Sequence, residues 1–95
     1  MDLNIKTTAK NGQLIVYIIN KNNVKILTVH ENGTGSCLLV PGEKYSFEWH
    51  TWNPAAADYT IIASVTGNPT GFPALNFAKS YSGPATDAGV FSFTV

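Results

Sequence analysis

The chain has 95 residues and no net charge, because six lysines balance six acidic residues, and charged residues make up only 13% of it. A chain of this length fits one domain, residues 1–95. It contains no arginine, so it lacks the guanidinium fork that reads phosphates and guanine edges, as well as the positive charge that attracts them. We therefore expect no nucleic-acid partner. No apolar run approaches the ~18 residues of a membrane-spanning helix, so no membrane insertion is expected.

Short segments of β-branched, aromatic or alternating apolar residues follow one another along the chain, separated by Gly, Pro and Asn. Such segments predict β-strands, and the turn residues between them predict where each strand ends. No window has the apolar spacing of an amphipathic helix. Strands are expected at residues 3–7, 14–19, 24–30, 37–40, 45–52, 59–65, 75–81 and 89–95.

Some of these segments carry more detailed expectations. Asn11-Gly12 is the strongest two-residue hairpin signal in the chain, because both residues tolerate positive φ. The strand 14–19 reads LIVYII, apolar on both faces, which predicts a central strand that is covered on both sides. Residues 82–89, with Gly83 and Pro84, are expected to form a loop.

The longest alternating segment lies within residues 41–65 and holds both tryptophans. It alternates over 45–52, breaks at Asn53-Pro54 and resumes over 59–65, which predicts two strands joined by a corner. Successive side chains of a strand point to opposite faces of the sheet. One face of the strand 45–52 is expected in the core (Tyr45, Phe47, Trp49 and Thr51), and the other on the surface (Ser46, Glu48, His50 and Trp52).

Strands at intervals of about 8–12 residues, with turn signals between them, are typical of a sandwich or barrel. The stretch LLVPGEKYSFEWHTWNP, followed by ADYTIIASV, resembles the late strands of bacterial immunoglobulin-like domains, the adhesion or accessory modules related to the CARDB family. The acidic, Asn-rich stretch in the last strand of that family has no counterpart here, where residues 86–89 read TDAG. The resemblance implies a non-catalytic module. The expected fold class is all-β, an immunoglobulin-like antiparallel β-sandwich of seven or eight strands.

The surface face of the strand 45–52 is the first candidate ligand site. It places Glu48, His50 and Trp52 in a row, about 6.5–7 Å apart. A sugar ring can stack its C–H face on an indole and hydrogen-bond its hydroxyls to neighbouring polar groups, so these three residues predict a shallow carbohydrate or peptide contact. The alternative is that Trp52 folds over residues 53–58 and covers the edge of the core, since tryptophan is highly buried on average.

A second candidate is the loop formed by Asn68, Pro69, Thr70, Gly71 and Phe72. It is similar to the N-P-T-T-G-F loop of the chagasin family, small immunoglobulin-like inhibitors that insert this loop into cysteine proteases. The match is one threonine short, and the other inhibitory loops of that family are missing. The alternative is a simple Gly/Pro turn.

Other chemistries lack a sequence signal. His30 and His50 have no second histidine or cysteine at ligand spacing, and the acids form no calcium-loop pattern, so neither a metal nor a cofactor is expected. The single cysteine, Cys37, cannot form an internal disulfide, and inside a short strand it is expected to be an inert small apolar residue. No enzyme activity is expected.

The sequence therefore indicates a non-catalytic binding module with a protein or glycan ligand. A surface rich in Thr, Asn, Ser and Gly favours an extracellular or cell-surface location on a bacterium, whereas the lack of a disulfide also suits a cytosolic protein. A cysteine-protease inhibitor that uses residues 68–72 and a structural subunit for assembly are the alternative functions.

Overall fold

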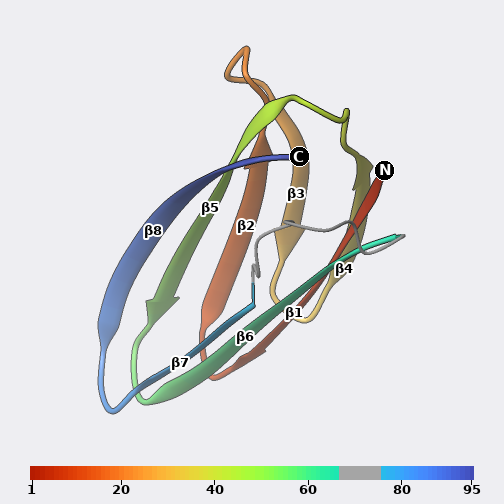
Figure 1. Ribbon diagram of the computed structural model, residues 1–95. Helices are drawn as coiled ribbons and strands as arrows, with labels where there is room; N and C mark the ends of the chain where they lie inside the picture. The colour runs from red at the N-terminus through yellow and green to blue at the C-terminus, as the bar shows by residue number, and fades with distance from the viewer. Residues whose placement is uncertain (67–75) are drawn as a thin grey trace.

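The computed structural model describes residues 1–66 and 76–95, and within these ranges every regular element is a β-strand. Two four-stranded antiparallel sheets pack face to face (Figure 1). The prediction of an all-β antiparallel sandwich is confirmed. The strands are β1 (Asp2–Lys10), β2 (Gln13–Ile19), β3 (Lys25–His30), β4 (Thr34–Leu38), β5 (Lys44–Asn53), β6 (Ala57–Val65), β7 (Phe77–Tyr81) and β8 (Ala85–Thr94).

Consecutive strands mostly lie in opposite sheets. Sheet I has the order β4-β1-β6-β7 and sheet II the order β3-β2-β5-β8. The predicted hairpin at Asn11-Gly12 is therefore wrong, because β1 and β2 belong to different sheets. Asn11 does have a positive φ, 67°, but Gly12 does not, and the turn carries the chain across the sandwich. The corner predicted at Asn53-Pro54 is confirmed, because β5 lies in sheet II and β6 in sheet I.

Strand order also bears on the immunoglobulin-like part of the expectation. The first two strands of a constant-type immunoglobulin domain share a sheet, whereas β1 and β2 of this chain do not. The structure supports an eight-stranded antiparallel sandwich. The immunoglobulin-like relationship stays a prediction.

The core lies between the sheets and is built by the period-2 alternation of the strands. Each strand of the central pairs sends every second side chain inward, and these side chains are almost completely removed from water, which is the main stabilising term of the fold. The most deeply buried apolar residues include Leu3, Ile5, Leu14, Val16, Ile18, Tyr59 and Ile61.

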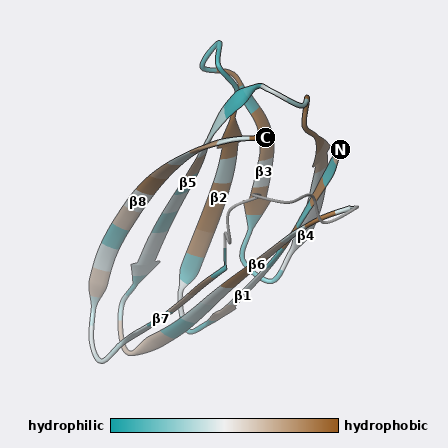
Figure 2. Ribbon diagram, in the orientation of Figure 1, coloured by the Kyte–Doolittle hydropathy of each residue, from teal (hydrophilic) through white to brown (hydrophobic). Residues whose placement is uncertain are grey.

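The strand β2 lies in the middle of sheet II and is hydrophobic along most of its length (Figure 2). Its inner residues are buried as predicted. The expectation that its other face is covered is wrong, because no other described element packs over Ile15, Tyr17 and Ile19, which are half-buried by neighbouring side chains of their own sheet. Of these three residues, Ile15 lines the site described below.

The loop predicted at 82–89 is also wrong in its second half. The strand β8 begins at Ala85, opposite Asn53, and pairs with β5 over ten residues. Gly83 and Pro84 do lie in a turn, but residues 85–88 continue the ladder because the long strand β5 offers them a partner. A prediction from local composition does not detect such a partner.

A buried asparagine fixes the end of the sandwich where β5 turns into β6. Asn53 is 1% exposed, and its Nδ2 donates to the carbonyl oxygens of Ala55 and Gly83 at 2.6 and 2.9 Å. Its Oδ1 accepts a hydrogen bond from the Tyr59 hydroxyl at 3.2 Å. These bonds tie the β5–β6 corner to the β7–β8 turn and so hold the neighbouring Trp52 in place.

Candidate functional site

The outer faces of the two sheets differ in chemistry. The outer face of sheet I carries mainly Ser, Thr, Asn, Lys and Asp, and several of these side chains pair with one another. Ser36 Oγ donates to Asn4 Oδ1 at 2.7 Å, and Ser80 Oγ donates to Asp58 Oδ1 at 2.6 Å. The outer face of sheet II combines aromatic, aliphatic and imidazole side chains near the β5–β6 corner with polar residues, among them Ser46, Glu48 and Ser92, toward its other end. An apolar surface with a few polar groups is typical of a binding face.

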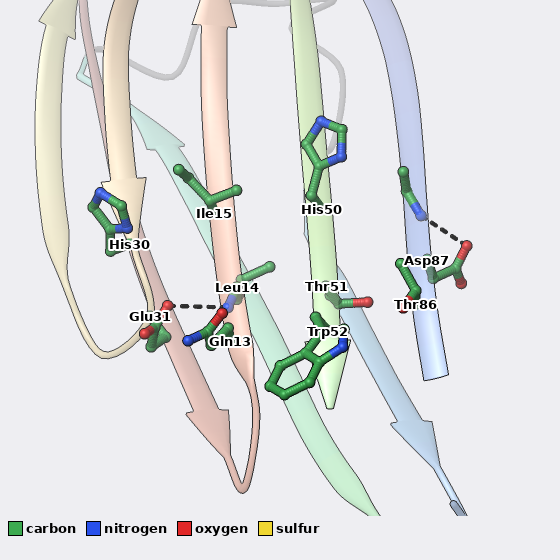
Figure 3. Close-up of a pocket in the computed structure, with 11 residues that line it drawn as sticks. Gln13, Leu14, Ile15, His30, Glu31, His50, Thr51, Trp52, Thr86 and Asp87 are labelled. Atoms are coloured by element: carbon green, nitrogen blue, oxygen red, sulfur yellow. Dashed lines mark hydrogen bonds between the residues drawn. The ribbon is translucent and has the colours of Figure 1, made fainter. Parts of the chain in front are cut away.

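A groove of about 620 Å³ lies on this face, at the end of sheet II where β5 meets the corner. Strand register forms it from two adjacent rows of side chains (Figure 3). In the first row Ile15 stands between His30 on one side and His50 on the other, with Ala88 beyond His50. In the second row Trp52 stands between Gln13 and Thr86. The site therefore draws on all four strands of the sheet.

Trp52 lies on the outer face of the sheet and is 50% exposed. Its indole extends from β5 toward Gln13 on β2 and forms one wall of the groove (Figure 3). The alternative prediction, in which Trp52 covers the edge of the core, does not describe this arrangement, because Asn53 and Tyr59 fill that position beneath it. The Trp52 backbone takes part there, since its carbonyl oxygen accepts a hydrogen bond from the Tyr59 hydroxyl at 3.1 Å.

The three predicted ligand residues do not share one site. His50 and Trp52 both line the groove, whereas Glu48 lies one row further along and lines a neighbouring depression of about 420 Å³. Glu48 is connected to the groove only through His50, whose Nε2 lies 3.7 Å from its Oε2. His50 also meets the ring of Tyr17 edge-on, with 6.0 Å between ring centroids. These contacts fix the orientation of the His50 imidazole.

Of the residues that line the groove, only His50 and Trp52 were assigned to this site from the sequence, and Gln13, Ile15 and His30 are among those that were missed. They are far from Trp52 in the chain and reach it only through the pairing of β2 with β5 and of β3 with β2. The one local signal was the position of Gln13 and His30 at strand ends that are otherwise apolar.

The acidic groups at the margin of the groove are engaged by protein donors. Glu31 Oε2 accepts a hydrogen bond from the Leu14 amide at 3.0 Å. Asp87 Oδ2 accepts hydrogen bonds from the Tyr81 hydroxyl at 2.6 Å and from Lys79 Nζ at 3.0 Å. These two bonds, with a third from the Ala88 amide, lower the pKa of the Asp87 carboxyl from 3.8 to about 2. Both carboxylates therefore stabilise the walls of the groove.

A reactive cysteine and a metal site are the other kinds of site to consider in the described part of the chain. Cys37 is half-buried on β4 in the other sheet, and burial raises the pKa of its thiol, which keeps it in the weakly nucleophilic protonated form. Within residues 1–66 and 76–95, no three His, Cys, Asp or Glu side chains gather in a way that could hold a metal ion. The same ranges contain no helix long and apolar enough to cross a membrane.

The second predicted site, Asn68 to Phe72, lies outside the described residues. The chain matches none of the known protein families, curated proteins or solved structures with which it was compared. The geometry of the groove is therefore the basis for assigning a function.

Proposed function

We propose that this protein is a non-catalytic binding module that holds a carbohydrate in the groove on the outer face of sheet II. The observation that carries the proposal is the half-exposed indole of Trp52 in a groove that is also lined by the polar side chains of His50, His30 and Gln13. The module would act in a secreted or surface-associated bacterial protein of the immunoglobulin-like kind. Its low content of charged residues, 13%, supports this setting.

The chemistry of the groove favours a sugar. One face of a pyranose ring is made of C–H groups, which pack against an aromatic plane, while its hydroxyls need donors and acceptors around the rim. Trp52 offers the plane, and Gln13 offers both a donor and an acceptor. Each neutral imidazole also offers one donor and one acceptor. Because Glu31 and Asp87 are already hydrogen-bonded, the polar groups left for a ligand are mostly uncharged, which suits a neutral sugar.

Substitution of Trp52 tests this proposal. We expect wild-type protein to bind neutral glycans on an array, and Trp52→Ala to weaken the affinity for the best of them roughly tenfold or more, because the stacking surface is lost. The matched control is Ile62→Ala, which removes a similarly exposed apolar side chain (54% exposed) from the outer face of sheet I. Equal binding by wild type and Trp52→Ala, or an array without any bound glycan, would refute the proposal.

Two further variants locate the ligand on the sheet. His50 lines the groove and Glu48 does not, so His50→Ala is expected to reduce affinity more than Glu48→Ala. The reverse order would move the ligand to the neighbouring depression near Glu48.

A peptide ligand is the second candidate for the same groove. The supporting observation is that the aliphatic side chains of Ile15 and Ala88 also line the groove, on either side of His50, which suits an apolar peptide side chain. Binding to a peptide library with no binding to glycans would favour this reading.

A further inference from the structure

The strand β8 is a long edge strand of sheet II (Figure 1). One of its edges pairs with β5 over all ten of its residues, and within the described residues no strand pairs with its other edge. An unpaired edge presents a row of backbone donors and acceptors that can bind another strand. The three other edge strands carry features that limit such pairing: β3 contains Lys25 and adjoins a register shift, β7 contains Lys79, and β4 is only five residues long.

One hydrogen bond at the end of β8 shows which of its backbone N–H and C=O groups point toward β5 and which point to the free edge. The amide of Val95 donates to the carbonyl oxygen of Glu43, toward β5, at 3.1 Å. Backbone groups in an antiparallel ladder alternate between the two sides of a strand. The amides of Ala88, Val90 and Ser92 therefore point to the free edge. The Ala88 amide agrees with this, because it donates to Asp87 Oδ1 at 2.8 Å and not to β5.

The free edge of β8 has two halves: in residues 85–88 a side chain blocks further strand pairing, and in residues 89–94 nothing of this kind is present. Asp87 occupies the Ala88 amide and is itself held by Tyr81 and Lys79 of β7, so charged side chains guard the first residues of β8. Residues 89–94 read GVFSFT and contain neither a charged residue nor a proline. In this half Val90 is 64% and Phe91 48% exposed, and the darkest hydrophobic colouring of β8 lies there (Figure 2).

We infer that the open half of β8 pairs with the same strand of a second copy of this chain, antiparallel and related by a two-fold axis. Two copies of one edge are complementary under this symmetry, because each donor of one copy then meets an acceptor of the other. Because residues 89–94 carry no charge, the two copies of this segment can pair without repulsion between like charges. In each copy the charged pair of Asp87 and Lys79 lies at the beginning of β8 and limits the pairing to residues 89–94.

The alternation of the backbone groups restricts the register. Residues with edge-facing amides must pair with one another, which allows Val90 to lie opposite Ser92 of the second copy. Phe91 then lies opposite its own symmetry mate in a non-hydrogen-bonded pair, the position at which side chains come closest. This register covers the half-exposed Phe91 of both copies at the two-fold axis.

The pairing has a consequence for binding that rests on the proposed function. A two-fold axis perpendicular to the sheet would join two copies of sheet II into one sheet and leave both grooves on the same side. Two grooves on one rigid face would bind a multivalent glycan surface with an avidity well above the affinity of either groove.

Sedimentation equilibrium in the absence of glycan tests the pairing independently of the proposed function. We expect the mass to rise with concentration, from micromolar to millimolar protein, toward twice the 10.2 kDa of the chain. Ser92→Pro removes an edge-facing amide and leaves the ladder to β5 intact, since proline is tolerated where its nitrogen faces away from the partner strand. Val90→Lys adds a charge to the exposed edge. Each is expected to weaken association at least tenfold.

Ser36→Pro is the matched control. Ser36 lies on the edge strand β4, and its amide also points away from the paired strand, because Leu39 N, three residues on, donates to Met1 O on the β1 side. This variant should associate like wild type. If Ser92→Pro fails to fold by circular dichroism, Val90→Lys, which changes only an exposed side chain, still gives the answer. A wild-type protein that stays monomeric at millimolar concentration would overturn the inference.

Oxidative cross-linking tests the register. In a Cys37→Ala background, Phe91→Cys is expected to form a covalent dimer readily, because directly opposed residues of a non-hydrogen-bonded pair have Cα atoms within disulfide reach. Val90→Cys should cross-link much less, because two copies of Val90 lie diagonally across the axis. Equal cross-linking of both variants, growth beyond a dimer, or capture of a foreign extended peptide by a monomer would each reject pairing with a second copy in this register.

Discussion

The packing of Trp49 against Gly89 shows how single residues join the two sheets. Gly89 lies opposite Trp49 in the β5–β8 ladder, and a Cβ atom at position 89 would come within 2.5 Å of the indole Nε1. The indole occupies this space and reaches Phe77 of sheet I, with 4.5 Å between ring centroids. Lys79 Nζ lies 5.4 Å from the same indole, a distance at which a cation and an aromatic ring attract each other.

Gly89→Ala is therefore expected to lower the free energy of unfolding by about 1–3 kcal/mol, because the added methyl group displaces the indole. Urea denaturation followed by tryptophan fluorescence measures this change. Gly83→Ala is the control, since no atom lies within 4 Å of the added methyl group, and its effect should stay within about 0.5 kcal/mol. If both variants are equally stable, the packing of the Trp49 indole does not depend on the absence of a side chain at position 89.

Residue orientation was the part of the site that the sequence predicted best. Alternation over 45–52 correctly placed Phe47 and Trp49 inward and His50 and Trp52 outward, because the pleat of a strand depends only on neighbouring residues. The requirement for glycine at position 89 could not be predicted in this way. It depends on which strand lies opposite Trp49, and that is a property of the sheet.

At the scale of elements, β7 and β8 are connected through Asp87. This carboxylate binds Tyr81 and Lys79 of β7 and the backbone of its own strand, and so links the edges of the two sheets. Its pKa in the folded protein, about 2, lies below the ordinary value of 3.8. The ionised form of Asp87 thus favours the folded state at neutral pH. This contribution is complete above about pH 4 and is lost as the pH falls through about 2.

The expected result is that Asp87→Asn is less stable than wild type at neutral pH and that the difference between the two proteins disappears as the pH falls from 4 to 2. Urea denaturation across this range gives both curves. Asp2→Asn serves as the control, because the Asp2 carboxylate makes no hydrogen bond or ion pair with residues 1–66 or 76–95. Parallel curves for wild type and Asp87→Asn would show that the link between β7 and β8 does not depend on charge.

The existence of the strands could be predicted from the sequence, but their connections could not. Asn11-Gly12 has the residues of a hairpin, and only the burial of the inner faces of β1 and β2 against each other explains why the chain crosses the sandwich there. The start of β8 was missed for a related reason, since Ala85 is held in the ladder by the partner strand β5. Tertiary contacts override local preference at both places.

At the scale of the whole molecule, the groove depends on the order of the strands. His30, Gln13 and Trp52 are separated in sequence, and they meet because β3, β2 and β5 are neighbours in sheet II. Periodicity within a strand carries no information about which strand lies beside it. The sequence could therefore predict two of the groove residues, on a single strand, but not the groove itself.

The same strand order predicts slow folding. Among the strands of residues 1–66 and 76–95, only β2–β3 and β6–β7 are consecutive and also paired in a sheet. The other consecutive strands in these ranges lie in opposite sheets, so most ladders join distant parts of the chain. Because the entropy of closing these long loops is lost before the contacts form, such sandwiches fold in roughly milliseconds to seconds. Stopped-flow dilution from urea, followed by the fluorescence of the half-buried Trp49, is expected to give relaxation in this range, and a Trp52→Phe background removes the exposed indole from the signal. Folding within microseconds would contradict the long-range pairing of β1 with β6 and of β2 with β5, on which both the core and the groove depend.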